Sequence, residues 1–163
     1  MRKTLEAISL AALAVLFWST WRALSGPGQL PDRIPTHFDL AGHADGWGSP
    51  QALLMVPAVA FVLYLGITLV ARFPAVFNYP VRVTPENRRR LEELALNMIC
   101  WLKTELVCLF AWLQILTIDA ARRSGPKPSV NFALVPVSIV VVFATVGWHF
   151  VAMRRAASPR TGA

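Results

Sequence analysis

The sequence has few charged side chains and only two cysteines, and it contains neither an internal repeat nor a low-complexity tract. Cys100 and Cys108 fall in the same predicted helix, about 12 Å apart along its axis, so they cannot form a disulfide with each other. Charged residues make up 15 % of the 163 positions, whereas 55 % are hydrophobic and six are Trp. This composition, with a mean hydropathy of +0.50, is unusual for a water-soluble globular protein.

The apolar residues are grouped in four runs, at about 5–24, 52–71, 96–118 and 133–153. Each run is long enough to cross the hydrocarbon core of a bilayer as a helix, which takes about 20 residues. We therefore predict an all-α integral membrane four-helix bundle that forms a single membrane domain over residues 1–163. Arg2 and Lys3 before the first run imitate a signal peptide. No small-residue cleavage site follows, so we expect a retained span.

The formal net charge of +7 permits two interpretations of the basic residues. One is a nucleic-acid partner, but in a chain with four spans the basic side chains more often fix the orientation in the membrane. Ten of them lie in the termini and in the loop between the second and third runs, against five in the other two loops. We predict a multi-pass protein of the cell (plasma) membrane with both termini cytoplasmic, an ordered extracytoplasmic loop over 25–50 and no nucleic-acid partner.

A cytoplasmic helix is predicted over 85–95, directly before the third run. Thr84 and Pro85 have the form of a helix start, because a hydroxyl residue caps the helix and proline fits its first position. Basic and acidic side chains follow at i,i+4 spacing, which supports a helix. We expect this helix to continue without a break into the third span as far as Ile118. Its surface is a candidate contact for a cytosolic regulator or for anionic lipid headgroups.

The loop 25–50 holds the only dense cluster of His and Asp, as two pairs, His37 with Asp39 and His43 with Asp45. Imidazole and carboxylate groups bind zinc and similar divalent ions, which makes His37, Asp39 and Asp45 candidate metal ligands. No His-Glu-x-x-His or Cys-x-x-Cys motif accompanies them. Two other roles stay open, acid–base catalysis and the bonding of Asp carboxylates to backbone N–H groups in turns. We predict no cofactor other than this candidate divalent metal.

The same loop carries a family resemblance. The run Leu30-Pro-Asp-Arg-Ile-Pro-Thr-His-Phe-Asp, followed by Gly42, Asp45 and Trp47-Gly48-Ser49, resembles the bacterial and archaeal membrane family called domain of unknown function 1648. That domain is also found at the N-terminus of SdpI-type toxin-immunity proteins. The motif residues that form a candidate ligand-binding or structural loop are Pro31, Ile34, Pro35, His37, Phe38, Asp39, Gly42, Asp45 and Trp47.

The resemblance implies a multi-span protein with this loop outside the membrane and, for the immunity members, resistance to a secreted killing peptide. The sequence departs from the family in two ways. Pro50 stands where the family usually has a lysine, and the chain is too short for the extra spans of full SdpI-type proteins.

Among the polar residues inside the predicted spans we single out Lys103 and Glu105 in the third and His149 in the fourth. Ionisable groups at this depth are rare and are candidate functional sites. Lys103 and Glu105 are two positions apart on a helix and point to nearly opposite faces, so each needs its own partner. Contacts of Lys103 with Tyr64 and of Glu105 with His149 are compatible with the depth of these residues. Structural bonding and a proton or ion relay both stay open.

We predict a multi-pass membrane protein of non-enzymatic function, in which the outer loop serves recognition or structure in an immunity-like or sensor-like role. Its partners would be the lipid bilayer, an extracytoplasmic peptide and a cytosolic regulator; the oligomeric state is left open. The alternative is a membrane enzyme or small transporter that uses the loop His and Asp residues or the intramembrane Lys and Glu.

Overall fold

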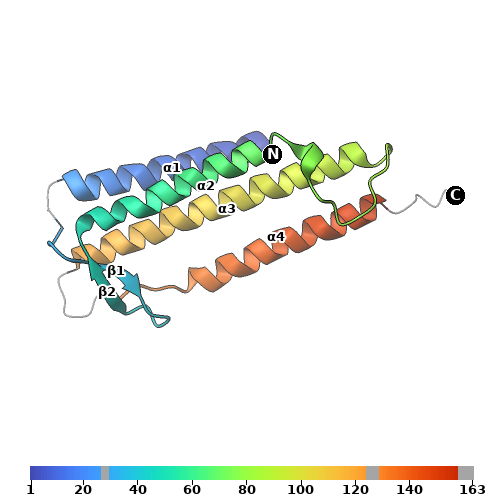
Figure 1. Cartoon of the computed structure of the whole chain (residues 1–163). Helices are drawn as coiled ribbons and strands as arrows, with labels where there is room; N and C mark the ends of the chain where they lie inside the picture. The colour runs from blue at the N-terminus through green and yellow to red at the C-terminus, as the bar shows by residue number, and fades with distance from the viewer. Residues whose placement is uncertain (27–29, 124–128, 158–163) are drawn as a thin grey trace.

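The computed structural model describes residues 1–26, 30–123 and 129–157, so the predictions on 27–29, 124–128 and the tail from 158 lie outside the described residues. Four antiparallel helices run side by side (Figure 1). They are α1 (Arg2–Ser25), α2 (Met55–Val70), α3 (Arg88–Arg122) and α4 (Leu134–Ala157). With the short helix η1 (Pro50–Leu54) before α2, all four are long and apolar enough to cross a membrane, which confirms the predicted fold class.

Helix α3 is the centre of the fold, since it packs against each of the other three helices. Its contact with α1 is the most extensive, and α2 completes a three-helix core. Two small side chains of this core, Ala60 of α2 and Ala111 of α3, favour close packing of the kind usual between membrane helices. The core residues are Leu13, Leu16, Ala60, Tyr64, Val107 and Ala111. Helix α4 makes its extensive helix contact with α3 and is set apart from α1 and α2 (Figure 1).

Helix α3 is continuous, as predicted, but it begins at Arg88, so the predicted start at residue 85 is wrong by three residues. Asn87 precedes the helix, and its side-chain oxygen accepts a hydrogen bond from the backbone N–H of Thr84 at 2.8 Å. The Thr84-Pro85 signal therefore marks a turn before the helix. Leu91 and Ala95 in the first turns are buried beneath Met153 and apolar residues of the connector 77–83, so this apolar stripe is covered by the chain itself.

The loop 25–50 contains a β-hairpin that the all-α prediction did not include. Strand β1 (Ile34–Phe38) pairs antiparallel with β2 (Ala44–Gly48), with irregular register on either side of His37. A turn joins them, closed by the N–H of Gly42 donating to the carbonyl of Asp39 at 2.9 Å. The hairpin lies at one end of the molecule, and the start of α1 and the end of α4 lie at the other (Figure 1).

We predict that Gly42→Ala disrupts this turn. Gly42 has a φ of +84°, and a Cβ there would lie 2.1 Å from the carbonyl oxygen of Val130. The left-handed backbone alone costs an L-residue about 1–2 kcal/mol, enough to raise hydrogen exchange of the Val130 amide about tenfold. That amide donates to the Gly42 carbonyl at 2.9 Å. Hydrogen exchange of the protein in micelles measures the effect.

The matched control is Gly66→Ala in α2, where an added Cβ meets nothing within 4 Å. This change should leave exchange at Val130 unchanged, because a helical alanine is preferred over glycine. Equal exchange at Val130 in both variants would contradict the role of Gly42.

Candidate functional site: the hairpin cap and two intramembrane polar clusters

The four His and Asp side chains of the hairpin form two separate pairs. His37 Nδ1 lies 2.5 Å from Asp45 Oδ1, and His43 Nδ1 lies 3.5 Å from Asp39 Oδ2. All four side chains are 43–73 % exposed, so solvent screens both pairs and they contribute little to stability. The pairing differs from the two sequence pairs, because the strands bring His37 opposite the segment that carries Asp45.

Asp39 also stabilises the turn. Its Oδ1 accepts a hydrogen bond from the backbone N–H of His43 at 2.8 Å, and this bond holds the pKa of the Asp39 carboxyl below its usual value. This is the turn-bonding role that the sequence left open. The three candidate metal ligands do not converge, since His37 lies with Asp45 while Asp39 lies with His43. Within the described residues no group of three or more His, Cys, Asp or Glu could hold a metal ion.

The apolar residues of the motif attach the hairpin to the helices. Ile34 is fully buried in a cluster formed by the hairpin-side ends of α1 and α3 and by η1, namely Ala23, Leu53, Ile118 and Ala121. Pro35 beside it is also buried, and Phe38 packs edge-on against Phe132, with ring centroids 5.9 Å apart. The motif therefore fixes the base of the hairpin by burial.

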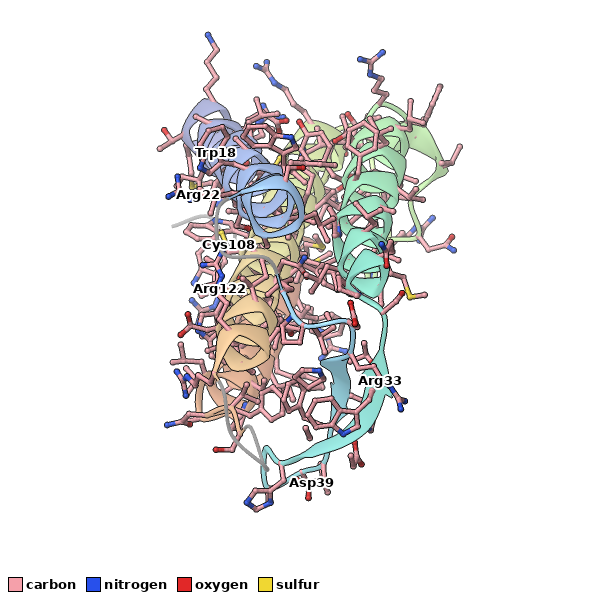
Figure 2. All side chains as sticks on the ribbon, turned by 90° about the vertical axis from the view of Figure 1, so that its left-hand side faces the viewer. Trp18, Arg22, Arg33, Asp39, Cys108 and Arg122 are labelled. Atoms are coloured by element: carbon pink, nitrogen blue, oxygen red, sulfur yellow. The ribbon has the colours of Figure 1, made fainter. Side chains whose placement is uncertain are left out.

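Other hairpin residues face outward. Trp47 lies opposite Pro35 in the register and is 42 % exposed, Leu40 in the turn is fully exposed, and Pro31 before the strand is exposed. Figure 2, seen from the hairpin end, places Asp39 at the far tip of the hairpin, away from Arg33 at its base. Two apolar side chains thus remain available for contact.

A cavity of about 840 Å³ lies between the hairpin turn and the segment that leads into α4. The hairpin contributes residues 38–41, including Asp39 and Leu40, and the opposite wall is formed by residues 129–136. Arg123 at the end of α3 adds a guanidinium group. The cavity therefore offers one acidic group, one basic group and apolar surface.

Lys103 forms the centre of a polar cluster between α1, α2 and α3. Its Nζ donates to Glu6 Oε2 at 2.6 Å and to Thr68 Oγ1 at 3.0 Å, and it lies 4.6 Å from the centroid of the Tyr64 ring. The Tyr64 hydroxyl also donates to Glu6. The predicted contact of Lys103 with Tyr64 is confirmed as a cation–π interaction. The sequence analysis did not single out Glu6, although Glu6 is an acidic residue inside the first apolar run.

Glu105 faces the opposite way, towards α4. The Thr145 hydroxyl donates to Glu105 Oε1 at 2.6 Å, and His149 Nδ1 lies 2.8 Å from the backbone oxygen of Thr145. Glu105 and His149 are therefore linked through Thr145, in place of the direct contact that the sequence suggested. The prediction that Lys103 and Glu105 need separate partners is confirmed.

Gln114 is a further polar residue that sequence reasoning did not single out. It is fully buried in α3, and its Nε2 donates to Thr20 Oγ1 at 2.8 Å and to the carbonyl of Leu53 at 2.9 Å. These bonds join α3 to α1 and η1 at the hairpin end. In the sequence, the signal for a buried polar contact was an amide side chain within the third apolar run.

Four apolar helices and a hairpin cap define a multi-pass membrane protein. Residues 7–61 match the family described as "Domain of unknown function (DUF1648)", which confirms the resemblance. The match covers most of α1, the hairpin and the first part of α2.

The chain is also similar to an uncharacterized protein of Archaeoglobus fulgidus, with 37 % identity over 86 residues. The match covers 48 % of this chain and 45 % of the relative, so the chain spans less than half the length of that curated relative. No solved structure matches the chain significantly. The relation to SdpI-type immunity proteins stays a prediction.

We predict that Lys103→Met destabilises the helix core by about 2 kcal/mol. Removing one partner of a buried ion pair costs about 3–5 kcal/mol, and exposure of Glu6 reduces that penalty. The Lys103 side chain is 5 % exposed and that of Glu6 is 37 % exposed. Denaturant unfolding in micelles measures the loss. The double variant with Glu6→Gln should lose less than the sum of the two single variants.

Arg89→Met is the control for this experiment. Arg89 pairs with Glu93 at 3.3 Å on the exposed surface of α3, where such a pair contributes at most about 1 kcal/mol. Strict additivity of Lys103→Met and Glu6→Gln would show that the two charges do not stabilise each other.

Proposed function

We propose that the chain is a non-enzymatic protein of the cell membrane that recognises an extracytoplasmic peptide through its hairpin cap. The observation that carries this proposal is the cavity of about 840 Å³ between the hairpin turn and residues 129–136. Its volume lies in the range typical of ligand sites, about 300–1,000 Å³. The combination of Asp39, Arg123 and the exposed Leu40 suits a ligand with both charges and apolar side chains, which is the chemistry of a peptide.

The self-paired charges of the hairpin favour recognition over catalysis. Each Asp carboxylate already lies beside an imidazole, and Asp39 bonds the turn as well. An acid–base enzyme needs two titratable groups that converge on one reacting atom. The pairs His37 with Asp45 and His43 with Asp39 instead act within the hairpin. An immunity-like or sensor-like role follows, in which binding of a secreted peptide at the cap is the primary event.

The distribution of basic residues supports an outward-facing cap. Ten basic residues lie in the termini and the α2–α3 loop, and the positive-inside tendency places these segments in the cytoplasm. The start of α1 and the end of α4 both lie away from the hairpin (Figure 1). The hairpin is then extracytoplasmic.

Cysteine labelling tests this orientation. We expect Leu40→Cys in the hairpin turn to react with a membrane-impermeant maleimide in intact cells, whereas Val76→Cys reacts only after lysis. Both side chains are highly exposed, and Val76 lies in the connector after α2. Cys100 and Cys108 are replaced by Ala in both variants. Labelling of Val76→Cys and not Leu40→Cys in intact cells would reverse the proposed orientation.

The recognition role is tested in a strain that lacks the gene and is challenged with secreted peptides that attack the cell envelope. We expect the wild-type gene to restore survival and Leu40→Asp to reduce protection about tenfold, because it places a second carboxylate beside Asp39 in the cavity. Val76→Asp, an equally drastic change on the other side of the membrane, should protect like the wild type. If deletion changes survival with none of the peptides, the immunity role fails.

A further inference from the structure

The seam between α3 and α4 contains two buried polar atoms that have no partner in the described part of the chain: Glu105 Oε2 and His149 Nε2. His149 is 3 % exposed, and Glu105 is the central residue of α3. Buried polar atoms in native proteins are nearly always hydrogen-bonded. In the hydrocarbon region the cost of an unpartnered group is several kcal/mol, so this pair calls for a partner outside the chain.

Two cavities along the seam meet at Glu105. One, of about 430 Å³, extends towards the hairpin end past Leu109 and Trp112. The other, of about 510 Å³, extends towards the opposite end past Trp101 and contains His149. Glu105 lines both cavities, and nearly all of the remaining lining is apolar. The seam thus provides elongated apolar space on both sides of one carboxyl group.

The hydrogen bonds already present define what the two free atoms can accept. His149 Nδ1 lies 2.8 Å from the Thr145 carbonyl oxygen, which only accepts, so Nδ1 carries a hydrogen and Nε2 is the acceptor in this tautomer. Glu105 Oε1 is occupied by the Thr145 hydroxyl, which leaves Oε2 as an acceptor of the carboxylate. Lys103 is on the other face of α3 and pairs with Glu6. The free atoms therefore favour a cation with at least two N–H donors.

We propose that the α3–α4 seam binds a lipid-soluble primary amine, with its ammonium group at Glu105 Oε2 and His149 Nε2 and its hydrocarbon chain in the adjoining cavities. Charge complementarity favours an ammonium head group, because it donates to both acceptors and neutralises the carboxylate. The apolar lining of the cavities favours a hydrocarbon chain on the ligand. Because α3 is the helix that α4 contacts extensively, the sides of the seam are open to such a molecule from the bilayer. This site is separate from the hairpin cap and independent of the function proposed for it.

Calorimetric titration of the full chain in maltoside micelles with dodecylamine tests the proposal. We expect saturable binding with one amine per chain. Dodecanol, which lacks the charge, and dodecyltrimethylammonium, which lacks N–H donors, should bind at least about tenfold more weakly, the equivalent of one charge-assisted hydrogen bond. This comparison uses only the wild type. Equal binding of the three compounds, or no saturable binding of dodecylamine, would overturn the proposal. The partner of Glu105 Oε2 and His149 Nε2 would then be water, a lipid or another helix.

Glu105→Gln and Asp119→Asn form the matched pair of variants. Both remove one carboxylate from α3, and the Asp119 side chain is 58 % exposed beside Arg123, outside the seam. We expect Glu105→Gln to weaken dodecylamine binding at least about tenfold and Asp119→Asn to leave it unchanged. Glutamine still accepts the Thr145 hydrogen bond, so the fold is retained, and the unfolding midpoint checks this. Unchanged affinity in a folded Glu105→Gln variant would refute the site.

Discussion

The bilayer offers no hydrogen-bond partners to a polar side chain, and this constraint organises the contacts of α3. Each buried polar residue along α3 finds its partner on a particular neighbour. Lys103 bonds to Glu6 of α1 and to Thr68 of α2, and Gln114 bonds to α1 and η1. Within the described residues, Glu105 and Gln114 each keep one oxygen without a partner, because Thr145 of α4 bonds only Glu105 Oε1 and Gln114 bonds only through its Nε2. The polar positions of α3 thus define which helix lies on each of its faces.

The hairpin is stabilised mainly by the burial of apolar side chains and less by its charge pairs. Ile34 and Pro35 are buried against the helix ends, whereas the His and Asp pairs are exposed to solvent. Full burial of one large apolar side chain contributes about 1.5–3 kcal/mol, more than an exposed ion pair. The base of the hairpin is therefore attached to the helices by its apolar residues and not by the His and Asp pairs.

Most of the fold was predictable from the sequence because a helix that crosses the hydrocarbon core needs a run of about 20 apolar residues. The four spans, the continuous α3 and the separate directions of Lys103 and Glu105 all follow from helix geometry. The hairpin was not predicted, since the strand Ile-Pro-Thr-His-Phe contains a proline and is flanked by Pro31 and Gly42, which favour irregular structure. It forms because the helix ends provide a surface on which Ile34 is buried.

The sequence by itself determined that this chain crosses a membrane four times and which polar side chains lie within it. Only the tertiary structure decided how those side chains pair, because pairing depends on which helix faces lie together. It joined Lys103 to Glu6 across 97 positions of the sequence, and it linked Glu105 to His149 through Thr145. It also paired His37 with Asp45, because strand register and not sequence spacing decides which side chains meet across a hairpin.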